Sequence, residues 1–308
     1  MKKKYKALLA IGSVCILGTA MINNTIFQMH NKDTTPKPNE HFYKFKYGNI
    51  KYTVHGEGEP LLLIHDIFIG ANLGEWQNTV NHLAKHYKVY AIDLLGFGAS
   101  CKPDISYSSY LYVSLINSFI TDIIGEKCYV VASSGSAPFA VLATSFKNDN
   151  FKKLILVSPV NSINFYSKFT RSLVESPLIG TTIYNIMSSK FYRRSFLENM
   201  VYFDPSKITD SIIDNYHHTA HIGGANAKYP IALLVGGYLD VNISTHLKNI
   251  SIPTHIIWGA ENKLNNIGNY DSIRSLNPDI DITIINETGL QPHSESPLEF
   301  TKACKKFL

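Results

Sequence analysis

Residues 128–146 read CYVVASSGSAPFAVLATSF, an apolar run, a turn of small residues and a second apolar run of helical length. The first run predicts a buried strand and the second predicts a helix. Ser134 lies between them, with the small residues Ala132 and Ser136 two positions away on either side. A sharp strand-to-helix turn strains the residue at its tip and leaves no room for large neighbours. The pattern therefore predicts such a turn, with Ser134 at its tip.

Short apolar runs alternate with helical patterns along most of the chain. Uninterrupted runs of this length are typical of strands buried on both faces of a parallel sheet. FYKFKYG (42–48) and NIKYTVHG (49–56) predict an opening antiparallel hairpin. The other expected strands are PLLLIHD (60–66), KVYAIDLL (88–95), CYVVAS (128–133), KLILVSP (153–159), PTHIIWGA (253–260) and ITIINET (282–288). The expected helices include 75–86, 114–124, 137–146 and 296–308. We therefore expect an α/β fold, a mostly parallel twisted sheet with helices on both faces.

The alternation breaks between residues 160 and 248. This segment is longer than a crossover connection requires, and it contains helical patterns such as TDSIIDNYHH. We interpret it as an inserted helical cap. Its expected place is over the carboxyl edge of the sheet, where open α/β sheets bind ligands.

The order of motifs resembles the α/β-hydrolase superfamily, of the capped serine-hydrolase type, over residues 41–308. The turn at Ser134 is similar to the nucleophile elbow of that family. LLLIHDIF (61–68) lies where the family has a strand ending in His-Gly, and AIDLLGFGAS (91–100) matches its Asp and Gly-x-Gly-x-Ser pattern. The resemblance implies an esterase or lipase-like fold with Ser134 as nucleophile. It also implies an oxyanion hole formed by the backbone N–H groups of Ile67 and Gly135.

Two of the three residues that the resemblance implies for catalysis are replaced. The family has its histidine in Gly-His-x-Pro-x-x-Glu-x-Pro, and here Glu295 and Pro297 place Leu290 in the histidine position. The acid position after PTHIIWG holds Asn262, although a shift of one residue would offer Glu261. Leucine cannot accept a proton, and a serine hydroxyl is a poor nucleophile without a base. The sequence therefore predicts impaired catalysis.

Asp66 is a third departure from the family pattern, which has glycine at that position. Its carboxylate would bring negative charge toward the place where an oxyanion develops. The turn is expected to survive while its electrostatics worsen.

Other histidines are alternative candidates for the base. His293 lies three residues after Leu290, and His217, His218 and His221 cluster in the cap. His217 and His221 are spaced to share one helix face. No carboxylate at motif spacing completes a metal site, so no metal or cofactor is expected.

The first residues resemble a membrane-targeting segment. Lys2, Lys3, Lys4 and Lys6 precede the apolar run ALLAIGSVCILGTAMI, a pattern typical of export or insertion. We expect residues 1–28 to be a signal anchor, or alternatively a cleaved signal peptide, followed by a linker at 29–40. The domain would be membrane-anchored outside the cytoplasm, or secreted after cleavage.

Composition excludes several other classes. Without the four leader lysines, the 25 remaining basic residues nearly balance 24 acidic residues, so no nucleic-acid partner is expected. Cys15, Cys101, Cys128 and Cys304 lack the spacing of a disulfide framework or zinc site.

Three hypotheses follow from these patterns. The first is a membrane-associated, catalytically impaired hydrolase-fold protein that binds a small apolar or acyl-type ligand under the cap. The second is an active carboxylic-ester hydrolase with a rewired base. The third is a non-catalytic interaction domain, which a cap packed tightly over Ser134 would favour.

Overall fold

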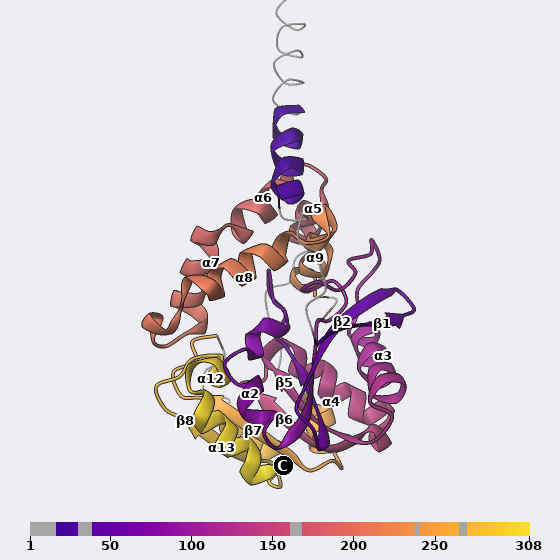
Figure 1. The fold of residues 1–308 in the computed structure, drawn as a ribbon, viewed down its shortest axis with the longest axis vertical. Coiled ribbons are helices and arrows are strands. Elements are labelled where there is room, and N and C mark those ends of the chain that lie inside the picture. The colour runs from indigo at the N-terminus through magenta and orange to yellow at the C-terminus, as the bar shows by residue number, and fades with distance from the viewer. Residues whose placement is uncertain (1–16, 30–38, 161–167, 238, 240, 265–269) are drawn as a thin grey trace, which may run out of the picture.

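The computed structural model describes residues 17–29, 39–160, 168–237, 239, 241–264 and 270–308. Within these residues, eight strands form one sheet with the order β1-β2-β4-β3-β5-β6-β7-β8 (Figure 1). The strands are β1 (Glu40–Phe45), β2 (Gly48–His55), β3 (Glu59–Ile64), β4 (Tyr87–Ile92), β5 (Cys128–Ser133), β6 (Phe151–Val157), β7 (Thr254–Gly259) and β8 (Asp281–Ile285). β1, β2 and β4 pair antiparallel, and all other neighbours pair parallel. The predicted α/β fold and opening hairpin are confirmed.

Alternate residues of the central strands enter two separate cores. Leu62, Ile64 and Val130 belong to the larger core, while Leu61 and Val131 belong to the smaller one. This alternation places one core on each face of the sheet, as the side-chain period of a strand requires. Burial on both faces explains why the strands read as continuous apolar runs.

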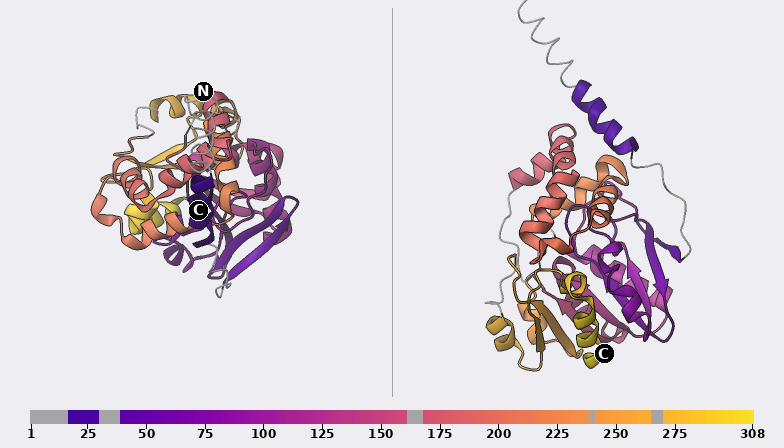
Figure 2. Two further views of the ribbon diagram at one scale, coloured as in Figure 1. Left: turned by 90° about the horizontal axis from the view of Figure 1, so that it is seen from above. Right: turned by 60° about the vertical axis from the view of Figure 1, so that its left-hand side comes forward.

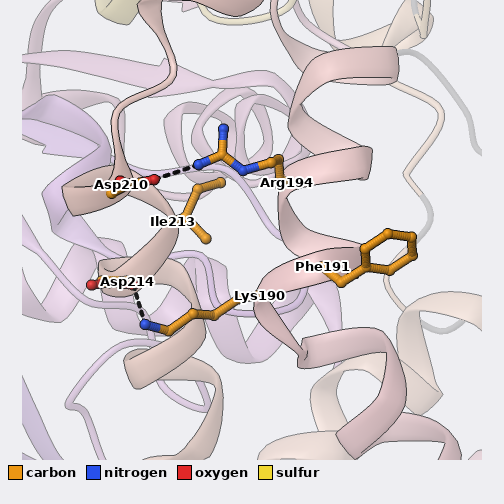
Figure 3. Close-up of a pocket in the computed structure, with 6 residues that line it drawn as sticks. All are labelled: Lys190, Phe191, Arg194, Asp210, Ile213 and Asp214. Atoms are coloured by element: carbon orange, nitrogen blue, oxygen red, sulfur yellow. Dashed lines mark hydrogen bonds and ion pairs between the residues drawn. The ribbon is translucent and has the colours of Figure 1, made fainter.

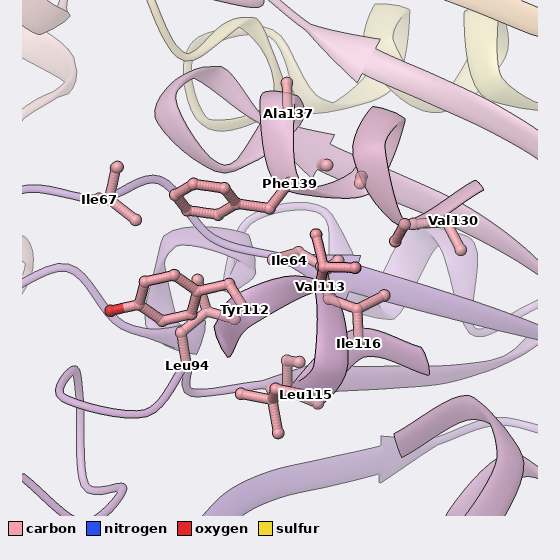
Figure 4. Close-up of a cluster of buried hydrophobic side chains, with 14 of the residues drawn as sticks. Ile64, Ile67, Leu94, Tyr112, Val113, Leu115, Ile116, Val130, Ala137 and Phe139 are labelled. Carbon is pink, nitrogen blue, oxygen red and sulfur yellow. The ribbon is translucent and has the colours of Figure 1, made fainter. Parts of the chain in front are cut away.

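The two faces are covered by different helices. α3 (Ser109–Phe119) and α4 (Ala137–Phe146) pack together over the larger core. There Phe139 stacks on Tyr112 with ring centroids 4.8 Å apart (Figure 4). The other face is covered by α2 (Val80–Leu83), α12 (Pro292–Glu295) and α13 (Pro297–Phe307). A further helix, α10 (Ser244–Lys248), packs against α4 and against α11 (Tyr270–Leu276).

The prediction of one helix over residues 75–86 is wrong. The structure has a single short turn at Leu73–Trp76 followed by α2. Glu75 and Trp76 are both buried, and the Glu75 carboxylate accepts the backbone N–H of Asp66 at 2.9 Å. These long-range contacts fix the chain in a way that one continuous outer helix does not allow, so tertiary packing overrides the local pattern.

The segment expected to form a cap does contain a group of helices above the sheet (Figure 1). They are α5 (Lys168–Glu175), α6 (Ile179–Ser188), α7 (Lys190–Phe196), α8 (Asp210–His221) and α9 (Tyr229–Val235), with short turns at Leu197–Val201, Pro205–Lys207 and Gly224–Lys228. The Thr219 hydroxyl donates to Gly70 O at 2.6 Å, and Leu290 N–H donates to Val201 O at 2.7 Å. Gly70 follows the carboxyl end of β3, and Leu290 follows that of β8. The cap therefore covers the carboxyl edge of the sheet.

A helix at residues 17–29 packs on the cap (Figures 1 and 2). Most of the expected signal segment 1–28 and of the linker 29–40 lies outside the described residues. Among the helices that are described, none has the length and apolar character needed to cross a membrane.

Candidate active site

Ser134 occupies the turn between β5 and α4. Its φ is +38°, a left-handed conformation that is rare for a residue with a side chain. Ser133 is still extended, and Ala137 N–H already donates to Ser134 O to start the helix. The chain therefore reverses within a few residues, and the structure has the sharp turn predicted at Ser134.

Gly135 allows the turn to lie against the loop that follows β3. A Cβ on this residue would lie 2.4 Å from Ile67 Cγ1 and 2.9 Å from Asp66 Oδ1. Any larger residue would push the two turns apart. The close approach brings the N–H groups of Ile67 and Gly135, the two predicted oxyanion donors, to a common point.

That common point is already occupied by a carboxylate of the chain itself. Ile67 N–H donates to Asp66 Oδ1 at 2.7 Å, and Gly135 N–H donates to the same oxygen at 2.8 Å. Asp66 is only 4% exposed. An oxyanion hole works by directing preorganised donors at a developing negative oxygen. Here the side-chain oxygen of Asp66 takes the place of that substrate oxygen.

The electrostatics of Asp66 reflect this buried position. Burial is the main cause that raises its pKa to about 7, and the neighbouring Glu75 raises it further. Hydrogen bonds from Gly135, Ile67 and the Ser134 hydroxyl act in the opposite direction because they favour the charged form. Burial and the neighbouring Glu75 thus favour the protonated form of Asp66, and the elbow serine is among the groups that favour the charged form.

Glu75 links this carboxylate to His293. The distance from Glu75 Oε1 to His293 Nε2 is 3.0 Å, and both side chains are fully buried. Burial raises the pKa of Glu75, but the hydrogen bond and charge of His293, together with the Ser133 hydroxyl, outweigh it and hold that pKa below its usual value. The His293 ring packs 4.2 Å from the Trp76 ring. His293 is thus committed to Glu75, and this placement gives no support to it as a base for Ser134.

Leu290, in the histidine position, is part of the cap packing. It is 1% exposed and lies in an apolar cluster formed almost entirely by cap residues. The other buried members are Leu197, Val201, Tyr202, Ile208, Ile212, Ile213 and Tyr216. Hydrocarbon takes the position where the resemblance implies a proton acceptor, and it helps to hold the cap against the loop after β8.

Asn262 and Glu261 follow β7, as expected of the acid position. Asn262 is buried, and its Oδ1 accepts Leu264 N–H at 3.0 Å in a local turn. Glu261 is exposed, and its backbone N–H donates to Thr288 O at 2.9 Å. Because Leu290 has no imidazole, neither residue has a histidine base at that position to orient.

The cap histidines lie at the contact between α8 and its neighbours. His217 Nδ1 is 2.8 Å from Ser188 O, and His221 Nε2 is 3.1 Å from Ser188 Oγ. The His221 ring also lies 5.8 Å from that of Phe27 in the helix at 17–29. His218 is half-buried on the same helix. The cluster therefore joins the cap to the helix at 17–29, and these contacts give no support to it as a base.

Cavities are present elsewhere on the molecule. The largest of four, about 400 Å³, lies between α7 and α8 (Figure 3), where Lys190 pairs with Asp214 and Arg194 pairs with Asp210, each at 2.5 Å. None of these four cavities is lined by Ser134. Ser134 itself is 2% exposed. The elbow serine is therefore buried.

Sequence reasoning missed Glu75 as a component of this centre. It lies in EWQN, which has the pattern of an outer helix, so no motif marked it. Asp66 was recognised as a departure, but the sequence carries no signal that its side chain turns back onto Ile67 and Gly135.

Comparisons with known proteins agree with this architecture. Residues 54–179 match the α/β-hydrolase-fold family. The 2-hydroxy-6-oxo-6-(2'-aminophenyl)hexa-2,4-dienoic acid hydrolase of Metapseudomonas resinovorans is 24% identical over 84% of this chain and 87% of its own length. Karrikin insensitive 2 receptor CA of Petunia hybrida is 26% identical over 68% of this chain and 76% of its own.

Two solved structures show the same fold. A serine hydrolase involved in carbazole degradation has a TM-score of 0.72 at 21% identity, covering 87% of this chain and 97% of that one. A bacterial membrane phospholipase A has a TM-score of 0.70 at 20% identity, covering 100% and 98%. The family match, the relatives and the shared fold together support the α/β-hydrolase superfamily for this chain.

Proposed function

We propose that this protein is a membrane-associated, catalytically impaired member of the superfamily, in which the elbow is sealed and the cap acts as an interaction surface. The observation that carries the proposal is the bond of Asp66 Oδ1 to both Ile67 N–H and Gly135 N–H. A substrate carbonyl has no free donors at that point. Ser134 itself is only 2% exposed, and Leu290 is buried in an apolar cluster with cap residues.

Magnitudes support impairment over slow but ordinary turnover. Loss of the triad histidine in a well-studied serine protease costs about 10⁶ in turnover, and the remaining catalysis comes from the oxyanion hole and binding. Loss of a single oxyanion donor costs a further factor of about 10²–10³. Here Leu290 stands in the position of the base, and Asp66 occupies the oxyanion hole. Proton transfer and oxyanion stabilisation would therefore both be impaired.

One of the relatives is named as a hydrolase and another as a karrikin insensitive receptor. A non-turnover role is therefore compatible with this scaffold. Because Ser134 is only 2% exposed, a small apolar or acyl-type ligand would reach it only if the surrounding chain moved, which favours an interaction role over a ligand pocket.

One observation favours a second candidate, a hydrolase in which Asp66 is the base. Its carboxyl contacts the Ser134 hydroxyl and has a pKa of about 7, a useful value for a general base. The same oxygen would have to leave Ile67 and Gly135 before a substrate enters. This candidate predicts ester turnover that rises with pH through about 7.

A fluorophosphonate probe separates the two readings. The wild-type chain and Ser134→Ala are incubated with the probe between pH 5 and 9, and labelling is read by intact mass. The proposal expects no labelling of Ser134 within the time in which an active serine hydrolase is fully labelled. Rapid labelling that increases through pH 7 and disappears in both Ser134→Ala and Asp66→Asn would replace it with the second candidate.

A further inference from the structure

The cap helix α6 directs apolar side chains outward and polar side chains inward. Ile179, Ile186 and Met187 are 57%, 49% and 44% exposed. The buried side of the same helix carries the polar residues Thr181, Asn185 and Ser188 beside one large aromatic residue, Tyr184. A surface helix of a protein in water normally shows the opposite arrangement.

The helix at residues 17–29 shows a similar arrangement, although Asn24, Thr25 and Gln28 are also exposed. Its buried side chains include Asn23, only 6% exposed, while Leu17, Met21 and Ile22 are 59–69% exposed. Phe27 is the apolar residue that it buries against the cap. Two neighbouring helices thus turn apolar surface outward on the same part of the molecule.

Hydrogen bonds between polar side chains hold the two helices together. Asn23 Nδ2 donates to Thr182 Oγ1 at 3.0 Å, and Asn185 Nδ2 donates to Asn23 Oδ1 at 2.9 Å. Figure 2 shows this helix on the cap, at the end of the molecule opposite the C-terminus. Polar contacts between helices combined with apolar outer faces are typical of helices surrounded by lipid.

A large exposed side chain on a neighbouring cap helix enlarges the surface. Phe169 on α5, which packs against α6, is 77% exposed. We call the exposed residues of α6 and of helix 17–29, together with Phe169, the outer cap face. Contiguous apolar surface on a folded protein marks an interaction site.

The sequence that precedes helix 17–29 indicates the occupant of this face. Residues 7–16, ALLAIGSVCI, carry no charge and join helix 17–29 directly, and four lysines precede them. Apolar sequence behind a basic start favours a lipid bilayer over another protein. We propose that the outer cap face rests in the interfacial region of a lipid bilayer, with the sheet directed away from it. This rests on the membrane association proposed above and adds the face that makes the contact.

Tryptophan quenching in vesicles tests the orientation. The full chain is reconstituted into phosphatidylcholine–phosphatidylglycerol vesicles whose acyl chains are brominated near the headgroup. The two native tryptophans, Trp76 and Trp258, are fully buried and give a constant background. Ile186→Trp is expected to emit at shorter wavelength and to lose most of its added fluorescence in brominated vesicles.

Leu298→Trp is the matched control, because Leu298 is 67% exposed on α13 at the far end of the molecule (Figure 1). It is expected to be unaffected by bromine. Flotation of the same samples measures membrane association independently. Flotation with equal, negligible quenching at both positions would overturn the assigned face while leaving membrane association intact. Failure to float would remove both, and a dimer seen by native mass measurement with no quenching at Ile186→Trp would assign the face to a second copy.

Discussion

The two turns at the centre of the sheet and the two loops at its β7–β8 side differ in what they retain. At the centre, Ser134 and Gly135 have the backbone geometry of a nucleophile elbow and its oxyanion donors. At the other side, the loops place Asn262 and Leu290 where an acid and a base are implied. Backbone turns survive because the fold depends on them, whereas proton transfer depends on a few side chains whose loss leaves the fold intact.

Restoring the side chains is the strongest way to break this comparison. If the backbone is sound, Asp66→Gly, Leu290→His and Asn262→Asp combined should raise the rate of fluorophosphonate labelling by about 10³-fold or more. The rate is measured by intact mass against time, with the same triple variant carrying Ser134→Ala as control. No gain in a folded triple variant would show that the elbow itself is unfit.

The pair formed by Glu75 and His293 sharpens the comparison on the stability side. His293→Leu leaves a buried carboxylate without its partner and should cost about 3–5 kcal/mol in the free energy of unfolding, measured by urea denaturation. Adding Glu75→Gln should recover much of that loss, because the uncompensated charge is then removed. Equal stability of His293→Leu and the wild type would mean that the pair carries no charge.

The contact between the two central turns gives a smaller effect. Gly135→Ala places a methyl group against Ile67 and Asp66 and should destabilise the fold by about 1–3 kcal/mol in the same assay. Gly18→Ala, where nothing lies within 4 Å of an added Cβ, should leave stability unchanged or slightly raised. A neutral Gly135→Ala would contradict the close approach of the turns.

The titration of Asp66 is expected to change the free energy of unfolding only gradually with pH. Its folded-state pKa of about 7 lies above the usual pKa of an aspartate, so the folded state binds more protons between these values. Stability from this group is present below about pH 4 and is lost as pH rises through about 7, by at most about 1.4 kcal/mol per pH unit. Asp66→Asn should keep the N–H contacts and flatten this slope in urea titrations from pH 4 to 8. Parallel slopes for the two chains would refute the raised pKa.

Predictions that rest on local sequence agree with the structure, whereas those that depend on contacts between distant residues do not. The strands and the turn at Ser134 were predictable because apolar runs and small residues act locally. The helix expected at 75–86 failed because the buried contacts of Glu75 and Trp76 come from distant parts of the chain. His293 and the cap histidines were reasonable base candidates by spacing, but only packing reveals that His293 Nε2 lies 3.0 Å from Glu75 and that His217 and His221 lie against Ser188.

By itself, the sequence determined the fold and the turn at Ser134, and it led to the proposal that Leu290 and Asn262 replace the histidine and the acid, because each of these rests on short-range pattern and residue type. Only the tertiary structure decided that the Asp66 carboxylate fills the hole between Ile67 and Gly135, and that α6 turns its apolar side outward. Both depend on which segments meet across the sheet edge and the cap. Hydrogen bonds and burial between residues far apart in the chain decide that meeting, and periodicity along one segment does not encode it.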